Sequence, residues 1–158
     1  MTETAPPIIV AEWLNTSEPP TLAALRGRVV VVECFQMLCP GCASHGLPQA
    51  QRIAQTFRPQ DVAVLGLHCV FEHHDAMTPV SLRAFLHEYR IRFPVAVDMP
   101  GDPGPLPQTM TRYGLEGTPT LLLIDRAGRL RARHFGTVPD LAIGAEIMAL
   151  VLEGTQDA

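Results

Sequence analysis

The sequence predicts an α/β fold in which a central mixed β-sheet is flanked by helices, and three observations lead to this prediction. Residues 29–35 form a nearly continuous apolar run rich in β-branched residues, as expected of a central strand covered on both faces. Strand-like runs and segments of helical periodicity then alternate along the chain. Two further strand-like runs, 120–125 and 130–135, are joined by the turn Asp125-Arg126-Ala127-Gly128, which indicates a hairpin. The order β-α-β-α-β, hairpin, α is typical of an α/β sandwich.

The amino-terminal part of the chain differs in composition from the rest. Residues 1–20 are rich in proline and polar residues, and only residues 8–14 have the apolar character of a strand. Residues 21–27 have the pattern of a short helical turn closed by glycine. We therefore predict one domain over residues 1–158, with an N-terminal extension over 1–20 and a core over about 28–153. The other predicted elements are strands over 61–69 and 93–97 and a loop over 99–107.

Three segments have helical periodicity. The first follows Cys42, and because Pro48 lies inside its apolar stripe we expect a kink there. The second begins at Thr78-Pro79, an N-cap followed by proline at the first helical position. The third covers about 138–153. The side chains expected to face the core are Ala43, Leu47, Ala50, Ala54, Phe57, Leu82, Phe85, Leu86, Tyr89, Leu141, Met148, Val151 and Leu152.

Composition and charge exclude several classes of function. With 47% hydrophobic and 18% charged residues, the chain is globular rather than disordered. Its net charge is −4 and it has no basic cluster, which argues against nucleic acid as a partner. We see neither a signal peptide nor a membrane span, so we expect no membrane association and a cytoplasmic location. In that compartment disulfides are usually transient and catalytic.

The stretch Cys39-Pro40-Gly41-Cys42 is the strongest functional signal. Two thiols separated by two residues, at a strand-to-helix junction in a chain with no other Cys-x-x-Cys, indicate a redox couple. A helix start carries unpaired backbone N–H groups and partial positive charge, which favour a thiolate over a thiol. We therefore expect Cys39, at the exposed helix start, to be the nucleophile and Cys42 to resolve the mixed disulfide.

This arrangement resembles the thioredoxin superfamily, over roughly residues 29–152. Besides the Cys-x-x-Cys motif at the end of an early central strand, Gly117-Thr118-Pro119-Thr120 precedes the hairpin, where thioredoxin-like proteins place a cis-proline facing the disulfide. The helix and strand predicted over 70–97 resemble the insertion of the TlpA-like and redoxin branch, the latter named for alkyl hydroperoxide reductase and thiol-specific antioxidant. The resemblance thus implies a thioredoxin-like fold with this insertion between the Cys-x-x-Cys helix and the cis-proline.

The resemblance also implies a role for Glu33, six positions before Cys39. Thioredoxin has a buried acid there that handles the proton of the resolving thiol. A carboxylate inside an apolar strand has its pKa raised by desolvation, which suits a proton shuttle near neutral pH. The alternative is a glutamate near the strand end that faces solvent.

Partner binding is implied at the same place. The resemblance implies that Pro119 and the backbone of Thr118 hold the partner chain as an added strand, and that Pro40 and Gly41 border the bound partner chain. The chain departs from thioredoxin at Leu38, where thioredoxin has tryptophan, and in the Pro-Gly order of the intervening pair. The residues between the two cysteines help set the choice of redox partner and the reduction potential, so both can differ from those of thioredoxin.

Three functions are compatible with these residues. The leading one is a thiol–disulfide oxidoreductase that exchanges the Cys39/Cys42 couple with a disulfide-containing protein or small-molecule thiol partner and is coupled to a thiol reductant or oxidant system. The second is a thiol-dependent peroxidase with antioxidant activity. The motif resembles the Thr-Pro-Gly-Cys of one peroxiredoxin branch, with Cys42 as the peroxidatic residue and Cys39 in place of the threonine. The third is a non-catalytic thioredoxin-like binding module.

We expect no cofactor and no metal. A zinc site at the motif would need two further ligands at suitable spacing, and a second Cys-x-x-Cys is missing. His45 either tunes the thiols or is an ordinary exposed histidine of the first helical turn. For His68, His73 and His74, a solvated loop with a partly buried His68 is favoured over a transition-metal site. The remaining thiols, Cys34 and Cys69, are expected to be small core residues.

Overall fold

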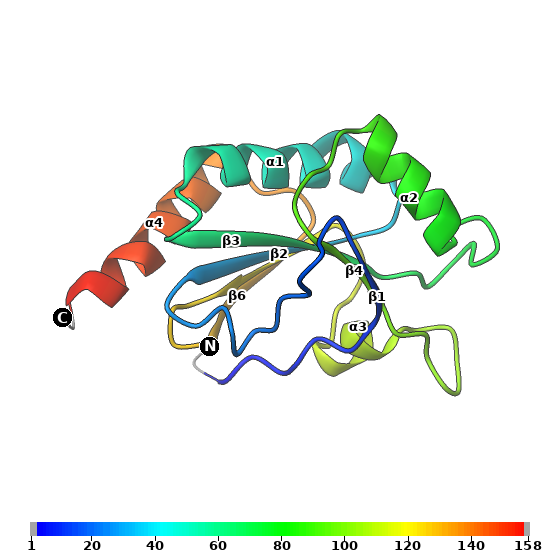
Figure 1. Ribbon diagram of the computed structural model, residues 1–158, viewed down its shortest axis with the longest axis horizontal. Helices are drawn as coiled ribbons and strands as arrows, with labels where there is room; N and C mark the ends of the chain where they lie inside the picture. The colour runs from blue at the N-terminus through cyan, green and yellow to red at the C-terminus, as the bar shows by residue number, and fades with distance from the viewer. Residues whose placement is uncertain (1–2, 157–158) are drawn as a thin grey trace.

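Six strands form one mixed sheet within residues 3–156, whose backbone the computed structural model describes; side chains are described for residues 3–153. The strands are β1 (Val10–Leu14), β2 (Val29–Phe35), β3 (Val62–His68), β4 (Val95–Asp98), β5 (Thr120–Ile124) and β6 (Leu130–Phe135). Their order across the sheet is β1-β4-β3-β2-β5-β6 (Figure 1). The pairs β2–β3 and β3–β4 are parallel, whereas β1, β5 and β6 pair antiparallel with their neighbours. The predicted fold class is confirmed.

Helices cover both faces of this sheet (Figure 1). They are the π-helical turn η1 (Cys42–Gly46), α1 (Leu47–Thr56), α2 (Pro79–Glu88), α3 (Gln108–Arg112) and α4 (Asp140–Gln156). η1, α1, α2 and α4 enclose a hydrophobic core against one face, which we call the α1 core. α3 and the N-terminal segment enclose a second one against the opposite face, the α3 core.

The position of β2 in the middle of the fold explains why its sequence is almost entirely apolar. Alternate side chains of a strand point to opposite faces, and here both faces are covered. Val29, Val31 and Phe35 enter the α1 core. Val30, Val32 and Cys34 enter the α3 core. Cys69 also lies in this core, so the prediction that Cys34 and Cys69 are core residues is confirmed. The alternation places one polar residue, Glu33, on the face of the α1 core.

The buried face of α4 differs from the predicted one. Leu141 is 91% exposed, and Met148 and Leu152 are about half exposed, so the expectation that they face inward was wrong. The buried side chains are Ile143, Ile147, Leu150 and Val151. Apolar residues surround most of this helix, so its sequence does not distinguish one stripe from the next. Contact with the sheet selects the buried stripe.

Ala54 on α1 was predicted to face the core but is exposed. Tyr89 is a further exception among the predicted core residues. It is 55% exposed because α2 ends at Glu88 and Tyr89 is its C-cap residue. Its ring stacks on Phe85, with the ring centroids 4.4 Å apart. The N-cap prediction was correct, since the Thr78 hydroxyl accepts a hydrogen bond from the Ser81 backbone N–H.

The N-terminal extension becomes an integral part of the sheet. β1 pairs with β4 at one edge, and the Ala5 backbone N–H donates to the Gly128 carbonyl. Residues 21–27 form consecutive hydrogen-bonded turns rather than a helix. Gly27 closes them with φ +94°, a conformation that favours glycine, and donates its N–H to Arg126.

Candidate functional site

Cys39 begins the helix that follows β2. Residues 40 and 41 are helical and continue directly into η1 and α1, so Pro40 occupies the first helical position. The Cys39 sulfur accepts a hydrogen bond from the Cys42 backbone N–H at 3.3 Å, the geometry of a helix N-cap. Because Cys39 is only partly buried, its sulfur combines access to solvent with the donors of a helix start.

Cys42 lies beneath Cys39 and has no exposed surface. Its Sγ is 2.6 Å from the Cys39 Sγ, so the two sulfurs are within reach of a bond. Burial, followed by the hydrogen bond with Cys39, raises the pKa of the Cys42 thiol. The pair therefore consists of one accessible sulfur and one neutral, sheltered thiol.

The first helical turns after the cysteines are irregular. The Leu47 backbone N–H donates to the Cys42 carbonyl, an i→i−5 bond that makes Cys42–Gly46 a π-helical turn. Pro48 then lies in the first turn of α1 and has no N–H to offer to the preceding turn. The irregularity that Pro48 predicts thus takes the form of a π turn, a feature frequent at functional sites.

The Thr118–Pro119 peptide bond is cis, and its loop lies against the cysteines. The Cys39 thiol donates to the Thr118 carbonyl, with Sγ and oxygen 3.6 Å apart. Gly41 packs closely on this loop, since a Cβ atom there would lie 3.3 Å from Cδ of Pro119. The structure therefore brings together Cys39, Gly41 and the Thr118–Pro119 loop.

Glu33 is buried below the motif, with 1% of its surface exposed, so the solvent-facing alternative does not apply. Its Oε1 is buried without a hydrogen-bond partner. A Cβ at Gly46 would overlap this oxygen and approach Pro119 Cβ at 3.1 Å, which shows how tightly the carboxyl is enclosed. Burial, and secondarily the charge of Cys39, raise the pKa of Glu33 well above its ordinary value.

Two of the histidines named in the sequence analysis, His45 and His74, contact backbone carbonyl groups. His45 is half-buried and its Nε2 lies 3.1 Å from the Val138 carbonyl, which Gln49 also contacts. His73 and His74 are exposed, and the His74 Nε2 lies 3.2 Å from the Pro105 carbonyl. Within the described part of the chain, no three His, Cys, Asp or Glu side chains are grouped to hold a metal ion.

For three residues of this region, the contacts that the structure shows were not predicted from the sequence. Gly46 encloses the Glu33 carboxyl, as described above. Gln36 and His68 are each 1% exposed, so the expectation of a partly buried His68 was wrong. Their hydrogen bonds join the loop after β2 to the end of β3 and to the loop after it. The available signal was a polar Gln36 between an apolar strand and the cysteines, and a His68 at the end of the neighbouring strand.

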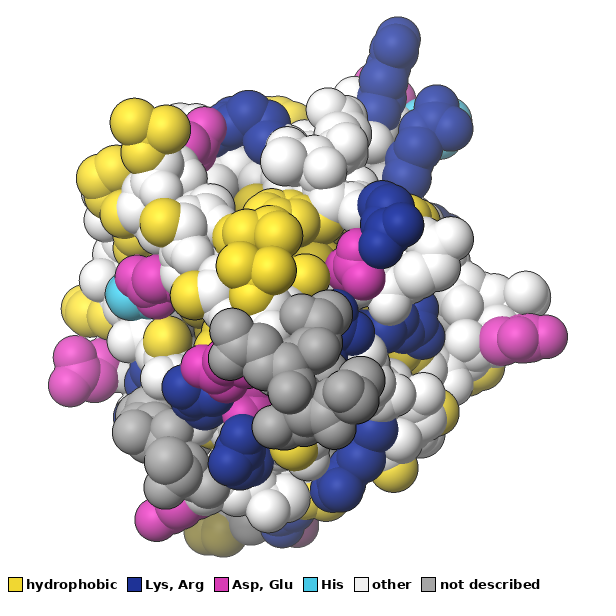
Figure 2. Space-filling model, turned by 90° about the vertical axis from the view of Figure 1, so that its left-hand side faces the viewer, with side chains coloured by type: hydrophobic (Ala, Val, Ile, Leu, Met, Phe, Trp, Pro, Cys, Tyr) yellow, Lys and Arg dark blue, Asp and Glu magenta, His cyan; other side chains and the backbone are white. Residues whose placement is uncertain are grey.

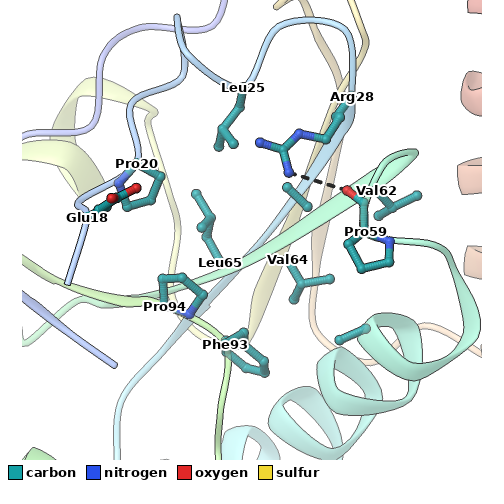
Figure 3. Close-up of a pocket in the computed structure, with 12 residues that line it drawn as sticks. Glu18, Pro20, Leu25, Arg28, Pro59, Val62, Val64, Leu65, Phe93 and Pro94 are labelled. Atoms are coloured by element: carbon teal, nitrogen blue, oxygen red, sulfur yellow. Dashed lines mark hydrogen bonds between the residues drawn. The ribbon is translucent and has the colours of Figure 1, made fainter. Parts of the chain in front are cut away.

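A pocket of about 300 Å³ lies at the other end of the sheet. Val62 and Val64 at the start of β3, Leu25 and Phe93 contribute to its lining (Figure 3). Figure 2 looks onto the end of the molecule where β2 and β3 begin, and hydrophobic side chains gather there among arginine and carboxylate side chains. Since Cys39 follows the end of β2, this pocket is separate from the thiol pair.

Comparisons with known proteins agree with this geometry. The AhpC/TSA family profile matches residues 2–133. The crystal structure of a thioredoxin-like superfamily protein is 60% identical, covers 94% of this chain and 96% of its own, and superposes with a TM-score of 0.93. A thiol-disulfide isomerase from Corynebacterium glutamicum is 52% identical, with 93% and 96% coverage and a TM-score of 0.89.

Similarity extends to parts of longer proteins. The protein DipZ of Mycobacterium tuberculosis is 29% identical over 129 residues, which make up 80% of this chain. The match covers only 17% of DipZ, so this chain corresponds to a small part of that relative. Among the residues that the structure describes, no helix has both the length and the apolar character needed to cross a bilayer.

Proposed function

Given that the chain belongs to the AhpC/TSA family, we propose that it is a thiol–disulfide oxidoreductase that works through Cys39 and Cys42. One observation carries this proposal. A partly exposed sulfur at a helix start accepts a backbone N–H, and a second, fully buried sulfur lies 2.6 Å away. This is the arrangement that disulfide exchange requires: an accessible attacking sulfur and a protected resolving one. The 52% identical structure is itself named a thiol-disulfide isomerase.

The first step forms a mixed disulfide. The Cys39 thiolate attacks one sulfur of the partner disulfide, a Cys39–partner bond forms, and the other partner sulfur leaves as a thiolate. The helix-start N–H of Cys42 stabilises the negative charge on Cys39 before the attack. Pro40, Gly41, Thr118 and Pro119 border the attacking Cys39 sulfur, and the partner chain lies along the Thr118–Pro119 loop as an added strand.

The second step releases the partner. Cys42 gives up its proton and attacks the Cys39 sulfur, which forms the Cys39–Cys42 disulfide and frees the remaining partner thiolate. Glu33 takes that proton. Support comes from its burial on the face of the α1 core, which contains Cys42, its unpartnered Oε1 and its raised pKa. An external thiol reductant then restores the dithiol, and an oxidant system would drive the same steps in reverse.

The test is to trap the intermediate. A Cys42→Ser variant should accumulate a mixed disulfide between Cys39 and a model disulfide such as insulin, because resolution is blocked. Mass spectrometry before and after dithiothreitol identifies the adduct, and Cys39→Ser serves as the matched control that should form none. An adduct on Cys42 in the Cys39→Ser variant, or none in either variant, would overturn the proposed order of attack.

The AhpC/TSA family match supports a second candidate, a thiol-dependent peroxidase with Cys42 as the peroxidatic residue. The site disfavours it, since Cys42 has no exposed surface and burial raises its pKa. Peroxide consumption with dithiothreitol as reductant separates the two candidates. Rapid turnover that needs Cys42 and not Cys39 would favour the peroxidase. The cytoplasmic location stays a prediction of the sequence analysis.

A further inference from the structure

The short segment Gln36–Leu38 joins β2 to the nucleophile, and hydrogen bonds hold its backbone. The Cys39 backbone N–H donates to the Gln36 carbonyl at 3.2 Å. The Met37 backbone N–H donates to Nε2 of His68, also at 3.2 Å. Met37 is buried, so removal of the imidazole would leave a buried N–H without a partner.

His68 is suited to this task because it stays neutral. It is 1% exposed and its ring contacts that of Phe35, with centroids 5.1 Å apart. Since Nε2 accepts the Met37 N–H, the ring proton of the neutral form is on Nδ1. Burial lowers the pKa of His68 to about 4, so the ring remains an acceptor at neutral pH. The two exchange steps give His68 no role of their own.

Gln36 makes the reciprocal connection. Its Oε1 accepts the Phe71 backbone N–H at 3.1 Å, and its Nε2 lies 3.4 Å from Oε1 of Glu72. His68 thus reaches from β3 to the loop after β2, while Gln36 reaches from that loop to the loop after β3. Together these bonds tie the chain before Cys39 to the neighbouring strand.

We propose that His68 is a positioning residue of the redox reaction, which, assisted by Gln36, holds the Met37 backbone so that the Cys39 sulfur stays against its stabilising donor. This inference rests on the proposed function of the Cys39/Cys42 couple. His68 makes its hydrogen bond to the Met37 backbone and acts through the segment that places Cys39.

Loss of the His68 imidazole should shift the redox equilibrium of the Cys39/Cys42 couple. The Cys39 sulfur accepts the Cys42 N–H at 3.3 Å, and this bond depends on where the 36–39 backbone places the sulfur. A thiolate is a stronger hydrogen-bond acceptor than a disulfide sulfur, so displacement of the loop destabilises the reduced form more than the oxidised form. Loss of His68 should therefore make the couple easier to oxidise by about fivefold, the equivalent of one net hydrogen bond.

The test compares His68→Leu, which removes the acceptor, with His68→Gln, whose amide oxygen can replace Nε2. Two quantities are measured on the whole protein: the equilibrium constant for oxidation of the dithiol by glutathione disulfide, and the rate of Cys39 alkylation by iodoacetamide at pH 7. For His68→Leu we expect the constant to rise about fivefold and alkylation to slow by a similar factor. His68→Gln should stay within about twofold of the wild type in both.

Val64→Ala is the matched control for general destabilisation, because Val64 is buried in the same strand at the end remote from the cysteines. It should lower stability without changing either redox quantity. Wild-type values in His68→Leu, or an equal change in Val64→Ala, would overturn the inference. If His68→Leu does not fold, His68→Asn, with an amide too short to reach Met37, is compared with His68→Gln under the same criteria. A wild-type couple that does not equilibrate with glutathione would instead refute the proposed function.

Discussion

Replacement of Gly46 by alanine should destabilise the protein, although the same change is favourable at most helical positions. Gly46 has φ −59° and ψ −54°, which any residue adopts, and in a helix alanine is better than glycine by about 1 kcal/mol. Here, however, the added methyl group would overlap Oε1 of Glu33 and lie 3.1 Å from both Glu33 Cδ and Pro119 Cβ. The sign of the change depends on which effect is larger.

The packing effect should be the larger one. Overpacking a dense core costs about 1–3 kcal/mol, and neither neighbour can move away easily. The Pro119 ring is rigid and buried, and the Glu33 carboxyl is enclosed on all sides. The overlap with Oε1 and the two further contacts place the cost in the upper part of this range, about 2–3 kcal/mol. Subtracting the helix-propensity gain of about 1 kcal/mol leaves a net loss of about 1–2 kcal/mol, or about 2–8 °C in Tm for a chain of this length.

Urea unfolding of the reduced proteins measures this loss. The matched control is Gly144→Ala in α4, where a Cβ atom would meet nothing within 4 Å, so the alanine should stabilise by about 0.5–1 kcal/mol. In a Glu33→Ala background, the cost of Gly46→Ala should fall by at least about 0.5 kcal/mol, because the main overlap has gone. A Gly46→Ala protein as stable as the wild type would refute the close packing of Glu33 against this helix.

Two further substitutions probe the buried carboxyls. The folded state holds the proton of Glu33 more tightly than the unfolded chain, so stability falls as pH rises from the ordinary glutamate pKa toward the raised one. Glu33→Gln has no titrating group there and lacks this loss. Its free energy of unfolding in urea, relative to that of the wild type, should therefore rise by at least about 1 kcal/mol between pH 5 and 8. A relative free energy that does not change with pH would contradict the raised pKa. Asp98 accepts the backbone N–H groups of Thr109 and Met110 at 2.8 and 2.9 Å, and asparagine can serve only one of them. Asp98→Asn should lower the free energy of unfolding in urea by about 1–3 kcal/mol. The equilibrium constant for oxidation of Cys39 and Cys42 by glutathione disulfide should stay within about twofold of the wild type, and a larger change would show that Asp98 is coupled to the cysteines across the sheet.

Some of the architecture could be predicted because one dominant pattern specifies it. The observed bounds of β2, Val29–Phe35, coincide with the predicted run, since burial on both faces leaves a continuous apolar sequence. The hairpin of β5 and β6 was predicted because turn residues separate two short apolar runs. α3 escaped prediction because it is very short, and because the carboxylate that holds its first backbone N–H groups, Asp98, lies across a loop at the end of β4.

The candidate site also contains residues that the sequence predicted and residues that it did not. The motif spacing alone placed Cys39 and Cys42 at a helix start, and the resemblance indicated which loop would face them. Nothing local to Gln36 or His68 indicated that they join two loops, since their partners lie more than thirty residues away. Gly46 likewise gains its importance from Glu33 and Pro119, which come from two other strands or loops.

By itself, the sequence determined the element order apart from α3, the strand-to-helix junction and the two thiols there, because propensity, periodicity and motif spacing act between neighbours along the chain. The tertiary structure alone decided how deeply Cys42 is buried, which side of α4 is buried and what surrounds the Glu33 carboxyl. Those properties depend on close packing and on the exclusion of water, and both arise only when segments distant in sequence come into contact.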